Sequence, residues 1–493
     1  MIHLLNIKGL TSLITLFLII SLYSCKELSS VHTKKYTEEQ MYRPNFHFTP
    51  QKGWMNDPNG MFFANGYYHL FYQYYPEGNV WGPMHWGHAI SKDLIKWEEL
   101  PIAIYPDKDK YIFSGSAVVD ASNTSGLKKG TMDPIVAIYT LHDMTKEKAG
   151  KIDVEQQDIA YSNDNGLTWH KFEEGNPVLK NPGIRDFRDP KVWYEEADAT
   201  FYMILGAAVH GDPAMLLFHS EDSERWTFHH VLYTAPKYFR ENGGRCVECP
   251  DFFCLDGVWV LIIGVVGYTE PVTGRHNLLF AQTGDFRNGN FTPSAQPLQM
   301  LDFGTDFYAL QTWGEDDSRT GFAWLYNWGT PKSVDSAWCG EMSLPRRFHL
   351  NAQQQLCMTP ILPPASLVNS EENVAESVLW SSVEGSKACV IAFRPSADFC
   401  LTLSGDSGQQ IVLDYDDKVL TLREKGQDDG RYHVPLASVQ DVTLSFDTGI
   451  VEVFANDGSV CGTRRYYSCS ALTQIKLTGA PAMITHYRAA YKK

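Results

Sequence analysis

A short sequence pattern recurs four times in the first two thirds of the 493-residue chain. In each copy an apolar run ends in Ser or Thr, an Asp follows two residues later, and an aromatic residue comes soon after. The Ser or Thr positions are 71, 58 and 63 residues apart, at Ser91, Ser162, Ser220 and Thr283. A unit of roughly 60 residues suits a four-stranded blade of a β-propeller with long loops. Unless the copies are a coincidence among common turn residues, residues 45–355 hold about five such blades.

The rest of the pattern is also typical of an all-β chain. Helical periodicity is almost absent, and short apolar runs such as residues 67–72 and 258–263 are separated by Gly, Asn, Asp and Pro. The composition changes near residues 351–375, and alternating strands then continue to the end, with a hairpin signal at Asn456-Asp457-Gly458. We therefore expect a second domain that is a β-sandwich.

The N-terminus predicts a targeting segment. Lys8 precedes an apolar run at residues 13–20, which is too short to span a bilayer as a mature helix. Leu22-Tyr23-Ser24-Cys25 then resembles a bacterial lipobox, in which the Cys becomes the lipid-modified N-terminus. We expect export across the inner membrane and a lipid anchor on Cys25 in the cell envelope. A plain signal peptide with an incidental Cys is the alternative.

These observations give five expected segments, in chain order. They are a lipoprotein signal peptide at residues 1–25, a tether at 26–43, a five-bladed propeller at 44–355, a linker at 356–372 and a β-sandwich at 373–493.

Charge and cysteine usage exclude several classes of function. The net charge of −16 argues against a nucleic-acid-binding protein, which normally carries a basic face. Nine cysteines besides Cys25 are odd in number and irregularly spaced, so no disulfide framework is predicted. Cys246 and Cys249 have the CxxC spacing, but a zinc site would need a second pair or nearby His ligands. We expect buried free thiols, no metal site and no cofactor.

Polar residues recur at one phase of the repeat, where the innermost strand of each blade is expected. Asp189 lies 27 residues after Ser162, and Glu248 lies 28 after Ser220, so both are expected to face the propeller axis. The first blade places Asp57 at its innermost strand. Glycoside hydrolysis uses two carboxyl groups, one ionised to attack the anomeric carbon and one protonated to donate to the leaving oxygen. A third can stabilise the positively charged transition state.

These residues also resemble a known family. The stretch Trp54-Met55-Asn56-Asp57-Pro58-Asn59-Gly60 is similar to the signature of glycoside hydrolase family 32, the invertase, inulinase and levanase family. Arg188-Asp189-Pro190 and Glu248-Cys249-Pro250 resemble its two other motifs, in the same order. Further similarity at residues 46–50, 85–89, 342–346 and 451–458 extends the resemblance over nearly everything after the tether.

The resemblance implies a five-bladed propeller followed by a β-sandwich, and it assigns roles to residues. Asp57 is then the nucleophile, Asp189 the transition-state stabiliser and Glu248 the acid/base. Sugar contacts are implied for Asn56, Gln73, Trp81, Phe113, Ser114 and Arg188, and also for Asp306 and Trp328, for which a structural Asp and a core Trp are the alternatives. Cys246 stands where an apolar or aromatic residue is expected, so that wall of the pocket differs.

The expected function is that of a retaining glycoside hydrolase that releases fructose from the non-reducing end of β-fructans, levan or inulin, and that also acts on sucrose. Three alternatives remain open at this point: an endo-acting levanase, a fructosyltransferase, and a non-catalytic fructan-binding lipoprotein. The last would need a missing carboxylate, and none is missing. The sequence leaves the choice between β-2,6 and β-2,1 linkages open. The expected partners are the fructan and, through the anchor, a membrane.

Overall fold

A computed structural model describes residues 42–196, 198–314, 319–325, 337–375, 379–427 and 430–491, except for the side chain of Val383. Cys25 lies outside the described residues, so the lipid attachment expected there stays a prediction. Among the described residues, no helix has the length and apolar character needed to cross a membrane.

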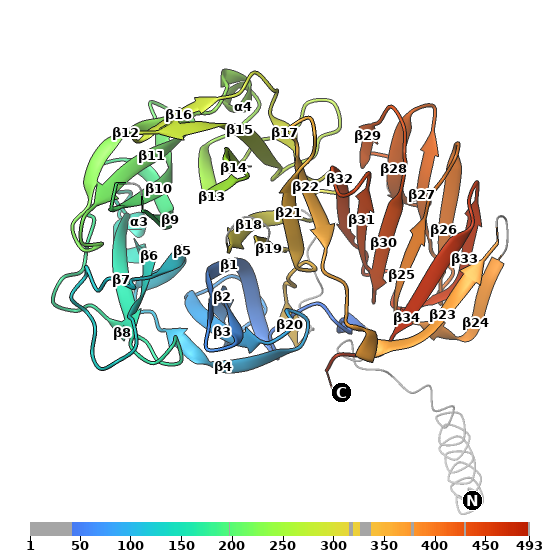
Figure 1. Cartoon of the computed structure of the whole chain (residues 1–493), viewed down its shortest axis with the longest axis horizontal. Coiled ribbons are helices and arrows are strands. Elements are labelled where there is room, and N and C mark those ends of the chain that lie inside the picture. Colours follow the sequence, from blue (N-terminus) through green and yellow to red (C-terminus); the bar gives the residue numbers. More distant parts are fainter. Residues whose placement is uncertain are drawn as a thin grey trace, which may run out of the picture. The chain divides into compact units, whose positions relative to one another are not determined.

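Residues 53–360 form five antiparallel sheets that stand in a ring, with one strand of each sheet innermost (Figure 1). In the first three sheets the strands follow chain order from the inside outward: β1 (Gly53–Ala64), β2 (Tyr67–Tyr75), β3 (His85–Ser91) and β4 (Trp97–Ile104); β5 (Lys110–Val119), β6 (Ile135–Asp143), β7 (Glu155–Ser162) and β8 (His170–Lys171); β9 (Arg185–Glu195), β10 (Thr200–Val209), β11 (Asp212–Ser220) and β12 (Thr227–Thr234).

The last two sheets complete the ring. The fourth contains β13 (Cys246–Leu255), β14 (Val258–Val266), β15 (Leu279–Arg287), β16 (Asn290–Pro293) and β17 (Gln299–Met300), and the fifth contains β18 (Tyr308–Trp313), β19 (Thr320–Trp324), β21 (Arg346–Leu350) and β22 (Leu356–Pro360). β20 (Trp338–Cys339) leaves the fifth sheet and pairs in parallel with β1, which links the end of the ring to its beginning. Two short helices, α3 (Met144–Lys148) and α4 (Lys237–Glu241), lie in loops.

The sequence repeat corresponds to the turn after the third strand of a blade. In the first three blades the aromatic residue is Trp97, Trp169 or Trp226, and its indole N–H donates to a turn carbonyl at 2.9–3.0 Å. The Asp side chain accepts backbone N–H groups of the same turn, as Asp93 does from Lys96 at 2.7 Å. The sequence repeat therefore marks a structural turn. The apolar faces of neighbouring blades pack against each other in shared clusters.

The C-terminal part is a sandwich of two six-stranded sheets, as expected. One contains β23 (Val368–Val374), β34 (Ala482–Tyr487), β25 (Ala388–Phe393), β30 (Val442–Asp447), β31 (Ile450–Ala455) and β32 (Val460–Arg465); the other contains β24 (Leu379–Ser386), β33 (Leu472–Thr478), β26 (Phe399–Gly405), β27 (Gln410–Asp416), β28 (Val419–Glu424) and β29 (His433–Pro435). Alternate side chains of both sheets fill one apolar core. The fold class predicted from the sequence, a five-bladed β-propeller followed by a β-sandwich, is confirmed.

The connection between the two domains is shorter than expected. The sequence places a linker at residues 356–372, but β22 at Leu356–Pro360 pairs with β21 and completes the fifth blade. β23 already begins the sandwich at Val368. Only residues 361–367, which include the short 3₁₀ helix η2 (Ala365–Leu367), lie between them. The polar, glutamine-rich residues 351–355 form the hairpin turn between β21 and β22.

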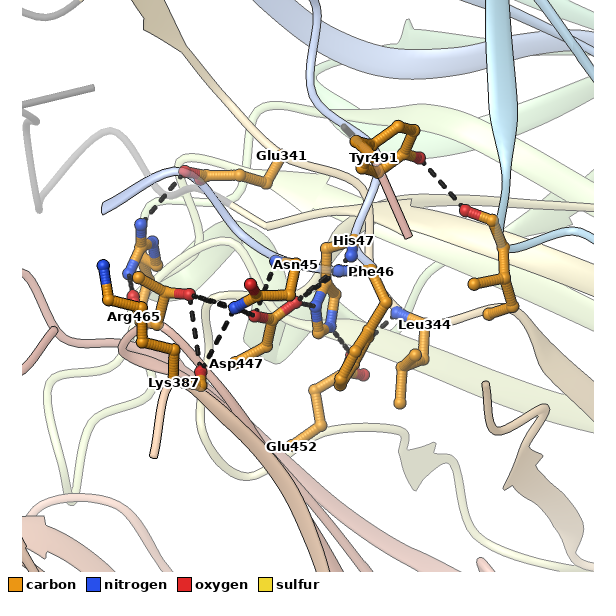
Figure 2. Close-up of polar contacts among 12 residues, drawn as sticks. Asn45, Phe46, His47, Glu341, Leu344, Lys387, Asp447, Glu452, Arg465 and Tyr491 are labelled. Atoms are coloured by element: carbon orange, nitrogen blue, oxygen red, sulfur yellow. Dashed lines mark hydrogen bonds and ion pairs between the residues drawn. The ribbon is translucent and has the colours of Figure 1, made fainter. Parts of the chain in front are cut away.

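Two buried carboxylates of the sandwich bind the start of the propeller (Figure 2). Asp447 accepts hydrogen bonds from the backbone N–H groups of Asn45 at 2.7 Å and Phe46 at 2.9 Å. The ring of His47 lies between the two carboxylates, with Nδ1 2.9 Å from Asp447 and Nε2 2.9 Å from Glu452. Glu452 also accepts from the backbone N–H of Leu344 at 2.7 Å. These bonds join the two domains through groups that are shielded from water.

His47 carries a positive charge in this arrangement, because both ring nitrogens face carboxylates. Burial alone would lower the pKa of His47, but its hydrogen bonds to Asp447 and Glu452 raise that pKa to about 9. The guanidinium of Arg346 donates to Glu452 at 2.6 Å and supplies a second positive charge. A buried carboxylate left without such partners would be strongly destabilising, so the cations and anions are stable only together.

We predict that His47→Gln destabilises the protein in a pH-dependent way. The folded state holds the His47 proton more tightly than the unfolded chain, so this stabilisation is complete below about pH 6.5 and disappears as the pH rises through about 9. The loss in free energy of unfolding should be roughly 3 kcal/mol near pH 6 and much smaller at pH 9.5. Denaturant unfolding at both pH values measures it, with the exposed His170→Gln as control. A loss that is equal at both pH values would contradict a charged His47.

Candidate active site

The innermost strands surround a cavity of about 490 Å³. Nine of the residues predicted as site residues line it together: Asn56, Asp57, Gln73, Trp81, Phe113, Ser114, Arg188, Asp189 and Glu248. They come from the first four blades, and Tyr308 and Trp324 of the fifth blade complete the wall. The structure thus brings together side chains as far apart in the sequence as Asn56 and Trp324.

A β-bulge in each innermost strand aims these side chains. In each of the five strands, three steps along the strand match two steps along its partner, which leaves one extra residue. The irregular stretches lie between Met55 and Pro58, Ile112 and Gly115, Arg188 and Lys191, Glu248 and Asp251, and Tyr308 and Gln311. A bulge bends a strand and re-aims a side chain that would otherwise face a neighbouring blade. The site residues of these strands lie in or beside the bulges.

Asp57 is held in orientation by two neighbours. The Ser114 hydroxyl donates to its Oδ2 at 2.6 Å, and the Cys249 thiol lies 3.4 Å from the same oxygen. Burial raises the pKa of Asp57, and the negative charge of Glu248 raises it further, while hydrogen bonds from Ser114 and Asn56 lower it. These two donors therefore favour the ionised form that a nucleophile needs.

Asp189 has an unusual backbone conformation, with φ of +64° inside the bulge of β9. Its carboxylate accepts from the backbone N–H of Cys249 at 2.9 Å, and its own N–H donates to Thr140 Oγ1 at 2.9 Å. Burial, together with the charges of Glu248 and Asp57, raises the pKa of Asp189 to about 7, although Arg188 opposes the shift. Repulsion among the carboxyl groups of the cavity thus contributes to the raised pKa values of Asp57 and Asp189.

Glu248 lies between two donors from the neighbouring blades. Arg188 Nη2 donates to its Oε1 at 2.7 Å, and the Tyr308 hydroxyl donates to its Oε2 at 3.0 Å. Its side chain is 20% exposed, so this carboxyl group can be reached from solvent. This position suits a group that exchanges a proton with a leaving oxygen and then with water.

Cys246 lies behind the cavity wall at the position where an apolar or aromatic residue was expected. The thiol is buried and does not line the cavity, and Arg188 Nη2 lies 3.3 Å from its sulfur. The side chain therefore packs behind Arg188, where a larger aromatic residue would need more space. The nine cysteines of the described part form no disulfide with one another, and seven of them are buried.

Gln73, Trp81 and Phe113 form the wall beside Asp57. The Gln73 side-chain Nε2 is buried and has no hydrogen-bond partner within the described residues, so it is available to a hydroxyl group of a ligand. Trp81 is 38% exposed and meets the Phe113 ring edge-on, with 6.0 Å between ring centroids. This wall combines a polar donor with an aromatic face, as a sugar site requires.

The sequence missed Tyr308 and selected Asp306 in its place. Thr305 has φ of +73°, which turns the chain before β18, so Asp306 does not face the axis. The Asp306 carboxylate instead accepts from the backbone N–H of Arg465 at 2.9 Å and pairs with Arg464 at 3.0 Å, both on β32 of the sandwich. The sugar contact expected for Asp306 is corrected accordingly. Trp328 lies outside the described residues.

Among the residues that the structure describes, no group of three or more His, Cys, Asp and Glu side chains is arranged to hold a metal ion.

We predict that Asp189→Asn stabilises the protein at alkaline pH. The folded-state pKa of about 7 lies above the usual value, so ionising Asp189 progressively destabilises the fold as the pH rises from about 4 to above 7. Asn has the same shape, accepts the Cys249 N–H and tolerates positive φ. The free energy of unfolding should rise by roughly 1–3 kcal/mol at pH 8 and change little at pH 4.5. Exposed Asp256, with φ of +50°, gives the control Asp256→Asn. A destabilised Asp189→Asn protein at pH 8 would contradict this account.

Comparison with known proteins identifies the family. The family model described as glycosyl hydrolases family 32 N-terminal domain matches residues 47–360, and the corresponding C-terminal model matches residues 377–483. The chain is 37% identical to a levanase of Bacillus subtilis over 465 residues, 85% of this chain and 65% of the levanase, so it spans just under two thirds of that relative.

Two further relatives cover nearly the whole chain. An extracellular exo-inulinase of Aspergillus niger is 31% identical over 89% of this chain and 92% of its own length. The structure superposes on a mutant β-fructofuranosidase of Bombyx mori, solved in complex with sucrose, with a TM-score of 0.80, 27% identity and coverage of 95% of this chain and 99% of that one. By its motifs, its fold and these matches, the chain belongs to glycoside hydrolase family 32.

Proposed function

We propose that this protein is a retaining β-fructosidase, in which Asp57 is the nucleophile, Glu248 the acid/base and Asp189 the stabiliser of the transition state. The observation that carries the proposal is the convergence of these three carboxyl groups, from three different blades, on one cavity. The relatives support the substrate class, because they are named for activity on levan and inulin, and one structure holds sucrose.

The environments of the carboxyl groups fit a double displacement. In the first step Asp57 attacks the anomeric carbon of the fructosyl unit, and its bond to Ser114 keeps Oδ2 fixed while the other oxygen reacts. Glu248 gives its proton to the leaving oxygen, which departs toward the open side of the cavity. In the second step Glu248 takes a proton from water, which displaces Asp57 and restores the starting configuration.

Asp189 acts on the charge that develops between these two steps. The sugar ring becomes positively charged in the transition state, and a nearby carboxylate stabilises it. The backbone N–H of Cys249 donates to the Asp189 carboxylate, and the Asp189 φ of +64° fixes the direction in which this side chain points.

The shape of the cavity favours removal of a terminal residue. Residues from the innermost strands of all five blades surround it, among them Asp57, Ser114, Asp189, Glu248 and Tyr308. A sugar ring enclosed on all these sides has no path along which the polymer could continue past it. We therefore propose exo-action on levan or inulin, and action on sucrose, in which the fructosyl unit is also terminal.

The site of action is proposed to be outside the cytoplasm. One relative is named as an extracellular enzyme, which supports export. Attachment to a membrane through Cys25 remains a prediction from the sequence.

We predict that Asp57→Asn and Glu248→Gln respond differently to the leaving group. With sucrose, both variants should lose at least about 10³-fold in kcat, because attack and proton donation are both needed. With an aryl β-fructofuranoside the phenolate leaves without a proton, so the first step of Glu248→Gln should approach the wild-type rate while Asp57→Asn stays inactive. Burst kinetics of phenolate release measure this step. Circular dichroism of both variants checks the fold, and near-normal hydrolysis of sucrose by Glu248→Gln would remove it from the acid/base role.

We predict that early digests of levan and inulin release free fructose and no short fructo-oligosaccharides. An enclosed cavity binds one terminal residue at a time, so each turnover shortens a chain by a single unit. Chromatography of products at low conversion tests this, with an endo-acting fructanase as the comparison. A ladder of oligosaccharides that appears before fructose would defeat the exo assignment and favour the endo-levanase.

A further inference from the structure

A charged pair behind the cavity wall reaches Glu248 through Arg188. His142 is on β6 and Glu155 on β7 of the second blade, and the side chains are 8% and 3% exposed. His142 Nδ1 lies 3.4 Å from Glu155 Oε1. The same oxygen accepts from Arg188 Nη1 at 3.0 Å, while Arg188 Nη2 donates to Glu248 at 2.7 Å. An unbroken series of ion pairs thus leads from His142 to the acid/base.

His142 has two further contacts. Its Nε2 lies 3.0 Å from Glu147 Oε2 on α3, a carboxylate that is half exposed. Its ring stacks on Phe113, with centroids 4.3 Å apart and an interplanar angle of 13°. Phe113 lines the cavity, so His142 supports both a wall of the cavity and the charge network behind it.

The charges of this network depend on one another. Burial opposes the positive charge of His142, but the two facing carboxylates, Glu155 and Glu147, raise its pKa above the ordinary value. Burial likewise opposes the negative charge of Glu155, but Arg188 and His142 lower its pKa. The partners of each group therefore favour its charged form.

The other charged or titratable groups around these residues belong to several elements. Asp186 on β9 accepts from Arg188 at 2.9 Å, and Tyr111 on β5 pairs with His142 across the sheet. The groups that face Glu248 are Arg188, Tyr308, Asp57, Asp189, Cys246, Cys249 and Arg245. Neither His142 nor Glu155 touches Glu248, so any influence they have acts through Arg188.

We propose that His142 and Glu155 are positioning residues that set, through Arg188, the pH range over which Glu248 keeps its catalytic proton. The proposal rests on the acid/base role given to Glu248 above. The negative charge of Glu155 weakens the electrostatic effect of the Arg188 positive charge on Glu248. The positive charge of His142 in turn weakens the effect of Glu155. The two residues therefore act on the catalytic proton with opposite signs.

Glu155→Gln and His142→Gln each remove one charge but keep a hydrogen-bonding side chain, so they test the two opposite effects on the Glu248 proton separately. Glu155→Gln removes a negative charge while its amide oxygen still accepts from Arg188. A positive charge then acts more fully on Glu248 and favours its ionised form. His142→Gln removes a positive charge while its amide still donates to a carboxylate, so the negative charge of Glu155 is less offset and Glu248 keeps its proton to higher pH.

The experiment is the pH profile of kcat/KM for sucrose hydrolysis, whose alkaline limb reports the essential acid of the free enzyme. Relative to wild type, the limb should move to lower pH in Glu155→Gln and to higher pH in His142→Gln, each by about half a pH unit or more. The double variant should return toward wild type. His170→Gln and Glu174→Gln are the same substitutions at exposed positions of the same blade and should not move the limb.

The outcomes separate this inference from the proposed function. If wild type does not hydrolyse fructosides, the proposed function fails. If wild type is active and both variants move the limb in the same direction, or lose activity without moving it, the two residues are only structural and the inference is overturned. If one single variant fails to fold, the other still tests the inference by the direction in which its alkaline limb moves. The double variant, once its unfolding midpoint shows that it is folded, tests whether the limb returns toward that of wild type.

Discussion

The bulge in every innermost strand is the constraint on which the site depends. A regular strand directs its side chains alternately at the two neighbouring blades, so the axis of a propeller would be lined mainly by backbone edges. One extra residue in each of five strands turns side chains toward the axis. Asp189 and Cys249 have positive φ inside two of these bulges, and the N–H of the second holds the carboxylate of the first. The irregular backbone of the bulges is thus what places the catalytic side chains in the cavity.

The protein treats its buried carboxylates in two opposite ways. At the domain interface, Asp447 and Glu452 have several donors each, and their pKa values are lowered despite complete burial. In the cavity, Asp57 and Asp189 have fewer partners and raised pKa values. The first arrangement stabilises the fold, and the second destabilises it but leaves groups able to react. Such separation of stable and strained regions is common in enzymes, whose reactive groups are rarely in their most stable environment.

The sequence predicted most of what depends on local turns and repeat phase. The Ser and Asp pattern located the turns after the third strands, and its phase placed Asp189 and Glu248 on one axis. Gln73 and Trp81 followed from the family resemblance. Asp306 has the structural role that was the alternative to a sugar contact, because the positive φ of Thr305 changes which side chain faces inward. His142 and Glu155 could not be found, because they lie on the second and third strands of a blade, where only packing brings them to Arg188.

The central claim is that Asp57 forms a covalent bond to the fructosyl unit while Glu248 handles the proton. Its most direct test is mass spectrometry of Glu248→Gln protein after brief exposure to an aryl β-fructofuranoside. That substrate lets the first step proceed without an acid, and the variant lacks the base for the second step, so the intermediate should accumulate. The account predicts one added fructosyl unit on the peptide that contains Asp57. No adduct, or an adduct on a different carboxylate, would contradict it.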